Sequence, residues 1–201
     1  MIAILDYGSG NLRSAQRACE ETGQQVIVTS DYEIALRADG LVVPGVGAFG
    51  ACMAGLREVK GDALIHQRIK EKKKVLGICV GMQILFQSSA EAFSGNEPLG
   101  IGVFPGRVTK LSAPITPQIG WNTVSAPADS TLFKGIDKER FYFVHSYAAT
   151  EKVPNALNAE AEYGSRFLAA VESETVTAVQ FHPEKSGRAG LQLIRNWSEA
   201  L

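Results

Sequence analysis

Buried strand patterns alternate with helical patterns through the first half of this chain, and no other feature restricts the fold as strongly. Apolar runs at 1–6, 25–29 and 40–43 are typical of strands, and a helical pattern at about 11–22 separates the first two. Parallel strands need a crossover segment between them, usually a helix. The alternation therefore predicts a mostly parallel open sheet with helices on both faces.

After residue 100 the pattern changes to short strands that follow one another without clear helices between them. We expect these strands near Val103 and Val108 and over residues 141–144, 167–171 and 175–181, with antiparallel pairing. A helical pattern at 191–201 should cover the sheet. Since 45% of the 201 residues are hydrophobic, the chain can bury a full core. We therefore expect one α/β domain over residues 1–201.

A candidate nucleophile, Cys79, lies where a buried strand pattern meets two glycines, Gly77 and Gly81, just before a helical pattern. A sharp strand-to-helix turn lifts one side chain clear of the sheet, and glycines leave room for the close backbone approach. The N–H groups at the start of the helix favour a thiolate and can bind an oxyanion. Taken alone, the motif fits a buried strand-end cysteine equally well.

A candidate base and its carboxylate partner, His182 and Glu184, lie two residues apart at the end of a later strand pattern. In an extended segment residues i and i+2 point the same way, and Pro183 keeps the backbone out of the helical region. The carboxylate can then fix the imidazole tautomer, and the imidazole can deprotonate a thiol. Alone this spacing favours a surface turn, but together with Cys79 it favours a catalytic triad.

These two motifs, at 77–83 and 180–186, resemble the class I (triad) glutamine amidotransferases, and within them the glutaminase subunits of imidazole glycerol phosphate synthases. Further segments that resemble this family follow in the family order at 4–11, 44–47, 117–122 and 143–147. The resemblance covers essentially the whole chain. It implies hydrolysis of L-glutamine to L-glutamate and ammonia through a thioester on Cys79, with His182 and Glu184 completing the triad.

Ligands of open parallel sheets bind beyond the carboxyl ends of the strands, where the motif residues should meet. We expect backbone N–H groups of Val46, Gly47 and Val80 to hold the oxyanion of the tetrahedral intermediate. The resemblance further implies that the glutamine head group binds at Gly45, Gln83, Glu91, Ser146 and Tyr147.

Two of these residues have an alternative interpretation that the sequence leaves open. Glu91 fits the substrate ammonium, but it also fits a solvated acid at a helix end, and Tyr147 also fits a packed core tyrosine. His145 is the one rival base. Because no carboxylate lies near it in the sequence, we interpret it as a structural or interface histidine.

Ammonia released into water is protonated and diluted, so a glutaminase of this size implies a partner that consumes ammonia. By resemblance the partner is a (β/α)8-barrel cyclase subunit, which forms imidazole glycerol phosphate and AICAR in histidine biosynthesis as part of a heterodimer. The candidates for the docking face are Asn11, Trp121, Tyr142 and Lys185, which also fit cap, core and surface positions. We expect partner and nucleotide binding to reorient the loop at 45–47 and to activate Cys79.

Charge and glycine spacing argue against several other classes. With 20 Lys and Arg against 21 Asp and Glu, the net charge of −1 gives no electrostatic case for nucleic acid. The Gly8-Ser-Gly10 segment lacks the third glycine of a dinucleotide fingerprint, because Arg13 occupies that position. We therefore expect no nucleotide cofactor.

Cysteine usage and hydropathy bear on metal binding and location. Three separated cysteines without a Cys-x-x-Cys pair predict a reducing compartment and no metal site. No apolar stretch approaches the roughly 18 residues of a membrane span, and no signal-peptide pattern opens the chain. We expect a cytoplasmic protein without membrane contact.

Three rival functions remain at this stage. The nearest is another triad glutaminase, such as the one that serves pyridoxal phosphate synthesis, which would be distinguished by the synthase it co-purifies with. A cysteine peptidase or amidase with the same elbow would cleave peptides and show no preference for free glutamine. A degenerate regulatory subunit would not react at Cys79 with a glutamine-analogue electrophile.

Overall fold

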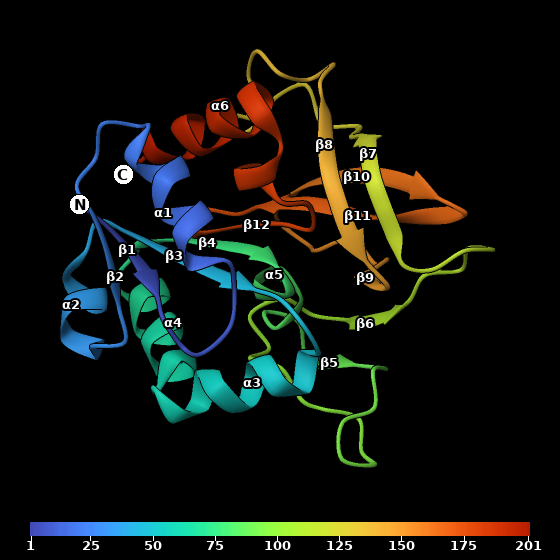
Figure 1. Cartoon of the computed structure of the whole chain (residues 1–201), viewed down its shortest axis with the longest axis horizontal. Helices are drawn as coiled ribbons and strands as arrows, with labels where there is room; N and C mark the ends of the chain where they lie inside the picture. Colours follow the sequence, from blue (N-terminus) through green and yellow to red (C-terminus); the bar gives the residue numbers. More distant parts are fainter.

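The computed structural model describes all 201 residues and confirms an α/β fold built on one central sheet (Figure 1). The strands of this sheet lie in the order β10 (Leu157–Tyr163), β11 (Ser165–Glu172), β12 (Val176–Val179), β4 (Lys74–Cys79), β3 (Gly40–Gly45), β1 (Ile2–Leu5) and β2 (Val26–Thr29). From β12 to β2 all neighbours pair in parallel, whereas β10 and β11 extend the sheet in antiparallel fashion. The predicted mixture of parallel and antiparallel pairing is confirmed.

Helices cover both faces of the sheet, as the alternating pattern predicted (Figure 1). On one face α1 (Leu12–Glu20) packs against α6 (Gly187–Ser198), and the other face carries α2 (Tyr32–Arg37), α3 (Phe49–Glu58) and α4 (Gly61–Lys70). The short helix α5 (Val80–Gln83) directly follows β4, and a 3-10 helix, η1 (Pro183–Lys185), follows β12. Side chains of Asn11 and Asp31 accept N–H groups at the starts of α1 and α2, which fixes where these helices begin.

Two smaller sheets lie beside the carboxyl ends of the central strands (Figure 1). One contains β5 (Ser88–Ser89), β6 (Arg107–Lys110) and β9 (Tyr147–Ala149), and the other pairs β7 (Gln118–Thr123) with β8 (Arg140–His145). Buried aromatic rings attach β8 to the central sheet, since the ring centroids of Phe141 and Phe181 lie 4.4 Å apart and Phe143 contacts both Phe167 and Phe181. This packing fixes β8 next to the segment that follows β12.

Some element predictions are wrong in detail. Val103 lies in an irregular segment rather than a strand, because Gly102 and Gly106 adopt φ of +75° and +96° on either side of it. The segment at 117–122, which had no periodicity that could be interpreted, lies largely in β7. That strand exposes Ile119 and Trp121, so its outer face lacks the polar alternation that marks a half-buried strand. Helices α2 and α3 were not predicted, since one is short and the other contains two glycines.

A fully buried arginine, Arg68 of α4, joins three elements of the fold. Its guanidinium donates hydrogen bonds of 2.8 to 3.2 Å to five backbone carbonyls, those of Ala35, Leu36, Ala38, Asp39 and Lys74. These carbonyls belong to the end of α2, to the turn before β3 and to the start of β4. Arg68 therefore satisfies acceptors that would otherwise be buried without partners.

Both chain ends lie at the amino ends of the central strands, away from α5 (Figure 1). The Met1 ammonium lies 2.5 Å from Asp39 Oδ2. Trp197 and Leu201 cover Gly40, where a Cβ atom would lie 2.7 Å from the Trp197 ring and 2.9 Å from the Leu201 side chain. The end of α6 is thus packed against the start of β3.

At the opposite end of the sheet, three neighbouring parallel strands finish close together. Gly45 at the end of β3 pairs with Cys79 at the end of β4, and Val179 at the end of β12 pairs with Ile78. The segments that follow these strands must therefore meet at this edge, where the sequence placed the chemistry.

Candidate active site

The predicted strand-to-helix turn is present at Cys79. This residue ends β4 with φ +57° and ψ −114°, a conformation that residues other than glycine rarely adopt. A Cβ atom on Gly77 would lie 2.7 Å from the carbonyl oxygen of Gly81, and one on Gly81 would overlap the carbonyl oxygen of Val43. Only glycine fits at both flanking positions, so the backbone holds the Cys79 side chain at the edge of the sheet.

His182 and Glu184 form the predicted buried pair, but not in an extended segment: Pro183 begins the 3-10 helix η1, and His182 immediately precedes it. His182 Nδ1 lies 2.7 Å from Glu184 Oε1, and the two side chains are only 2% and 4% exposed. The backbone of His182 is fixed as well: its N–H donates to the carbonyl of Tyr142, and its carbonyl accepts from Ser186 Oγ. Because Nδ1 donates to the carboxylate, Nε2 is the nitrogen left for proton transfer, and it is buried without a hydrogen-bond partner.

The charge state of His182 follows from these neighbours. Burial disfavours the imidazolium, but the adjacent Cys79 sulfur and the Glu184 carboxylate outweigh burial and raise the pKa of His182 well above its ordinary value. The raised pKa makes His182 a suitable acceptor for a proton from the sulfur.

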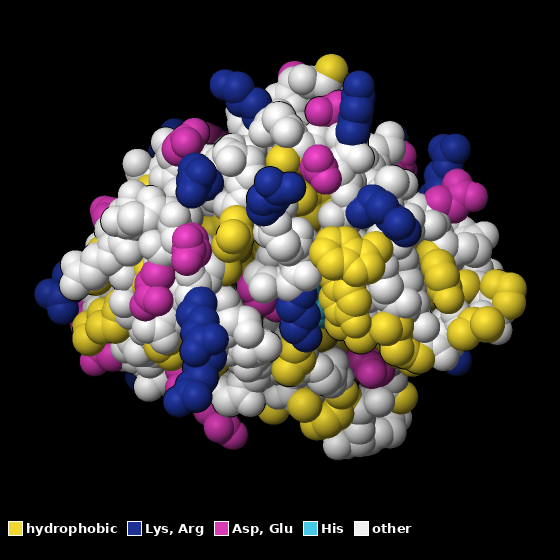
Figure 2. Space-filling model, turned by 45° about the horizontal axis from the view of Figure 1, so that its top comes forward, with side chains coloured by type: hydrophobic (Ala, Val, Ile, Leu, Met, Phe, Trp, Pro, Cys, Tyr) yellow, Lys and Arg dark blue, Asp and Glu magenta, His cyan; other side chains and the backbone are white.

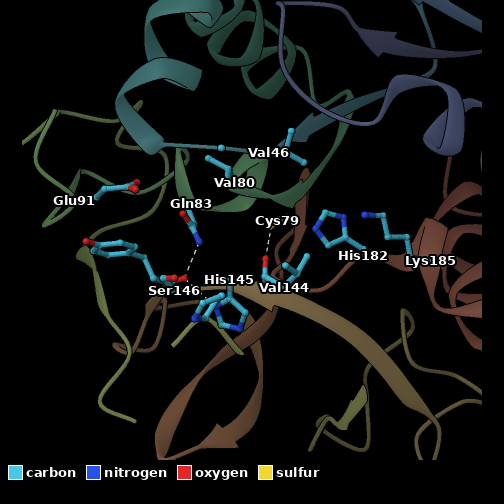
Figure 3. A pocket seen from close by; sticks show the side chains of 13 residues that line it. Val46, Cys79, Val80, Gln83, Glu91, Val144, His145, Ser146, His182 and Lys185 are labelled. Atoms are coloured by element: carbon cyan, nitrogen blue, oxygen red, sulfur yellow. Dashed lines mark hydrogen bonds between the residues drawn. The ribbon is translucent and has the colours of Figure 1, made fainter. Parts of the chain in front are cut away.

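A cavity of about 410 Å³ opens over Cys79 and collects most of the predicted site residues (Figure 3). Its volume lies in the range typical of small-ligand sites. The predicted residues that line it are Val46, Gly47, Cys79, Val80, Gln83, Glu91, Ser146, Tyr147, His182 and Lys185. His145, Val144 and Pro117 complete the lining. The fold therefore places around one cavity most of the residues that the sequence motifs indicated.

The remaining predicted residues lie outside the lining. Glu184 lies behind His182, and Gly45 is buried under the cavity, where a Cβ atom would lie 2.6 Å from the amide nitrogen of Gly81. Asn11, Trp121 and Tyr142 do not line the cavity.

Gln83 links the cavity to a buried glutamine that sequence reasoning missed. Its Nε2 donates to the carbonyl of Tyr147 at 2.7 Å and to Oε1 of Gln180 at 3.0 Å. Gln180 Nε2 in turn donates to the Cys79 sulfur at 3.8 Å. The position of Gln180 at the end of a predicted strand, two residues before His182, was the signal that could have revealed it.

Glu91 is not a freely solvated acid. Its Oε2 accepts the N–H of Phe49 at 2.8 Å, and Phe49 begins α3, where Ala48 offers no side-chain cap. A carboxylate at this position satisfies an otherwise unpaired N–H group and suits the positive end of the helix. Oε2 is the one oxygen of Glu91 with a hydrogen-bond partner, and the residue lines the cavity.

Ser9, which the sequence analysis did not identify, holds the loop after β3. Ser9 Oγ accepts the Val46 N–H at 3.1 Å and donates to the Val46 carbonyl at 2.9 Å. Cys52 Sγ also donates to that carbonyl, at 3.3 Å. Tyr7 holds the base of the loop, since its hydroxyl donates to the Pro44 carbonyl at 2.6 Å. In this arrangement the Val46 N–H is directed to Ser9 rather than into the cavity.

His145 lies in the cavity wall as a neutral group. Burial lowers the pKa of His145 to about 4, aided by the nearby His182, although the carbonyl of Tyr147 opposes this shift. Nδ1 donates to that carbonyl at 2.9 Å, and Nε2 lies 2.9 Å from Oε1 of Gln118; because a neutral ring has one N–H, the Gln118 amide must turn its NH₂ group toward Nε2. These contacts tie β8 to β7 and β9, and they engage both ring nitrogens.

The chain is similar to known proteins in both sequence and fold. A family model described as glutamine amidotransferase class-I matches residues 3–200. The chain is 59% identical to the imidazole glycerol phosphate synthase subunit HisH of Nocardia farcinica, over 100% of this chain and 98% of that relative. It is 52% identical to the subunit of the same name from Thermobifida fusca, again over 100% and 98%.

Solved structures with low sequence identity share the fold. A structure described as a crystal structure of glutamine amidotransferase superposes with a TM-score of 0.78 at 18% identity, over 99% of this chain and 97% of that chain. PurLQS from Thermotoga maritima gives a TM-score of 0.72 at 19% identity, over 98% and 97%. None of the helices found here has the length and apolar character needed to cross a membrane.

Proposed function

The chain belongs to the class-I glutamine amidotransferases, and we propose that it hydrolyses L-glutamine to L-glutamate and ammonia with Cys79, His182 and Glu184 as its triad. The observation that carries this proposal is the alignment of one buried acid–base pair with one strained cysteine. The His182–Glu184 contact of 2.7 Å leaves Nε2 unpaired next to Cys79, at the wall of a cavity. This is the nucleophile–base–carboxylate arrangement of covalent acyl transfer.

The first half of the reaction forms a thioester. His182 Nε2 takes the proton from Cys79 Sγ, while Glu184 holds the imidazole tautomer and stabilises the imidazolium. The thiolate attacks the carboxamide carbon of glutamine, and the electron pair of the C=O bond moves onto oxygen. As the tetrahedral intermediate collapses, the C–N bond breaks and His182 returns the proton to the leaving ammonia.

The second half releases glutamate. His182, neutral after ammonia leaves, removes a proton from a water molecule that attacks the thioester carbon. The C–S bond then breaks with its electron pair on sulfur, which regenerates the thiolate and imidazolium.

The glutamine head group fits the other side of the cavity. The free carboxylate oxygen of Glu91 suits the substrate ammonium, and Gln83, Ser146 and Tyr147 line the same wall. Gly45 contributes through its lack of a side chain, because a Cβ atom would collide with the elbow backbone and with the Tyr7 hydroxyl.

The oxyanion of the intermediate would be held by backbone N–H groups of Val80, at the start of α5, and of Val46 and Gly47. Since the Val46 N–H is bonded to Ser9, its peptide must turn before it can point into the cavity. Gly47, with φ +90°, and the Gly45 peptide provide the backbone freedom for that change. We therefore keep the hypothesis that partner and nucleotide binding reorient this loop and activate Cys79.

The relatives are named as subunits, so we propose that ammonia passes to a (β/α)8-barrel cyclase subunit that forms imidazole glycerol phosphate and AICAR in histidine biosynthesis. An apolar surface suitable for docking lies over β7 and β8, where hydrophobic side chains gather (Figure 2). Trp121 is 46% exposed and packs edge-on against Tyr142, with ring centroids 6.0 Å apart. Lys185 lies at the cavity wall, and Asn11, although it caps α1, is exposed. These four residues are our candidates for the docking face.

The test is glutamate release from glutamine by the purified chain, alone and with the cyclase subunit of the same organism and its nucleotide substrate. We expect strong stimulation by the partner and a loss of more than about a thousandfold in Cys79→Ala. Cys19→Ala is the matched control, because Cys19 is a buried cysteine of α1 that does not line the cavity. Its activity should equal that of the unmodified chain.

Other outcomes would redirect the proposal. Equal activity with and without the cyclase would keep the triad chemistry but assign the chain to a different synthase. No glutamate release and no labelling of Cys79 by a glutamine-analogue electrophile would favour a regulatory subunit, and cleavage of peptides would favour a peptidase.

A further inference from the structure

Gln180 is a fully buried polar residue next to the nucleophile. It directly follows β12, which lies beside β4 in the sheet, so Gln180 and Cys79 come from neighbouring strand ends. Its backbone N–H donates to the carbonyl of Ala169 at 2.8 Å, which holds the main chain in register with β11. Burial of a primary amide is unfavourable unless both its donors and its acceptor find partners.

The partners of this amide determine which way it faces. Gln180 Oε1 accepts the Nε2–H of Gln83 at 3.0 Å, and Gln83 is itself anchored by the carbonyl of Tyr147. With its oxygen occupied by a donor, the amide must turn its nitrogen toward Cys79, where Nε2 lies 3.8 Å from the sulfur. The sulfur is the one hydrogen-bond acceptor found for Gln180 Nε2.

We propose that Gln180 acts in the glutaminase reaction as a fixed hydrogen-bond donor to the Cys79 sulfur. The proposal rests on Cys79 being the nucleophile. Gln180 does not line the cavity, so it acts on the sulfur and not on the bound glutamine.

The strength of this hydrogen bond changes during the reaction. A thiolate accepts a hydrogen bond more strongly than a thiol or a thioester sulfur, because charged acceptors form stronger hydrogen bonds. Gln180 therefore favours the states in which the sulfur carries charge: the thiolate before attack, and the sulfur that takes back the electron pair when the C–S bond breaks. A donor whose interaction grows with developing charge accelerates the step.

Gln180 and His182 have different roles at the Cys79 sulfur. Gln180 directly follows β12 and His182 comes two residues later, so both approach Cys79 from the end of the same strand. His182 accepts and returns the proton, whereas the Gln180 amide carries no titratable proton at neutral pH and supplies a constant dipole. When Cys79 is protonated, its S–H faces the Val144 carbonyl at 3.9 Å, a contact that leaves the sulfur lone pairs to Gln180.

The test measures the rate at which iodoacetamide alkylates Cys79 as a function of pH, by mass spectrometry of the Cys79 peptide from the full chain. Gln180→Met removes the donor and keeps the length of the side chain. Gln180→Glu keeps an oxygen for Gln83 but places acceptors against the sulfur. We expect the pH midpoint of alkylation to rise in the order unmodified, Gln180→Met, Gln180→Glu, with Gln180→Glu shifted by about one pH unit or more.

Kinetics supply a second readout. With glutamine as substrate, kcat of Gln180→Met should fall roughly 10- to 100-fold, the effect of one hydrogen bond to a charged group, while KM changes by less than about threefold. Gln118→Met is the matched control, since Gln118 is another buried amide outside the cavity lining but contacts His145 instead of the sulfur. Its alkylation midpoint should equal that of the unmodified chain.

The proposal is overturned if the Gln180 variants melt at lower temperature yet keep the alkylation midpoint of the unmodified chain, or if Gln118→Met shifts the midpoint as much. Failure of the underlying function would look different: Cys79→Ala would then retain glutaminase activity. The two failures are therefore distinguishable.

Discussion

At Val46, a single peptide group separates the observed cavity from one in which all the proposed oxyanion donors face inward. Two side chains of the proposed triad are already in place, since His182 and Glu184 are hydrogen-bonded and buried. The Val46 N–H, however, is engaged by Ser9. A hydrogen bond of this kind contributes about 0.5–1.5 kcal/mol, small compared with the roughly 3 kcal/mol that one oxyanion donor contributes to catalysis. A partner therefore needs only modest differential binding energy to release this peptide.

Ser9→Ala should raise glutaminase activity of the chain in the absence of its partner by about 2- to 10-fold, because the Val46 N–H loses its acceptor. Ser9→Thr keeps a hydroxyl and should retain the low activity. The measurement is initial rate of glutamate release at saturating glutamine. If Ser9→Ala and the unmodified chain release glutamate at the same rate, Ser9 does not hold the loop in its resting arrangement.

Site residues could be predicted from the sequence when they belong to a short continuous motif. Cys79 with its glycines and the His182–Glu184 pair are encoded by short segments, and the structure brings both motifs to one cavity. Ser9 could not be found this way, since its contact with Val46 spans 37 positions and serine is common in turns. Gln180 likewise becomes meaningful only when β12 is placed beside β4.

At the scale of elements, the Arg68 side chain binds backbone carbonyls that a loop or a helix cap usually satisfies. The carbonyls at the end of α2 and around the start of β3 face the interior, and the Arg68 guanidinium binds them from α4. Burial lowers the pKa of Arg68 to about 10, although Glu71 and Asp39 oppose the shift, so the group remains charged at neutral pH. No carboxylate lies against it; the backbone dipoles of the carbonyls compensate the buried charge.

Arg68→Lys should destabilise the fold by about 3 kcal/mol, because an ammonium has three donors and cannot reach the five carbonyls that the planar fork satisfies. Urea unfolding followed by circular dichroism measures the change as a lower midpoint at an unchanged slope. Arg57→Lys, an exposed arginine of α3 that bonds one carbonyl, is the control and should change little. A free energy of unfolding for Arg68→Lys within about 0.5 kcal/mol of that of the unmodified chain would contradict this role.

Elements were predictable where hydrophobic periodicity is strong. The strands around Cys79 and the final helix follow from apolar spacing, although α6 spans Gly187–Ser198 and not the predicted 191–201. Helix α2 escaped prediction because its six residues span under two turns, and it depends on Arg68 and the Asp31 cap more than on an apolar stripe. Strand β7 was not predicted because Ile119 and Trp121 are exposed, so buried apolar and exposed polar residues do not alternate along it.

At the scale of the whole molecule, two histidines make stability depend on pH in opposite directions. The pKa of His145 is about 4 in the folded chain against about 6.5 when unfolded, so acid protonates the unfolded chain first and lowers stability. The pKa of His182 is raised on folding, so its contribution is complete below about pH 6.5 and is lost as pH rises through the folded value. Together these two groups place the most stable range near neutral pH.

His145→Gln should remove the acid-sensitive part of this dependence. In the unmodified chain the free energy of unfolding should fall by about 3 kcal/mol between pH 6.5 and 4 through His145 alone. The variant keeps a hydrogen-bonding side chain without a titratable ring, so its curve should be flatter by that amount. Urea midpoints at several pH values measure both curves, and parallel curves would show that His145 titrates normally in the folded state.

The positions of the chain ends carry a practical consequence for how this protein can be handled. Because Met1 and Leu201 both lie at the end of the sheet away from the cavity, a fluorescent fusion or a surface anchor attached at either end leaves the cavity mouth unobstructed. Leu201 packs on Gly40, so a C-terminal fusion needs a flexible spacer directly after that residue.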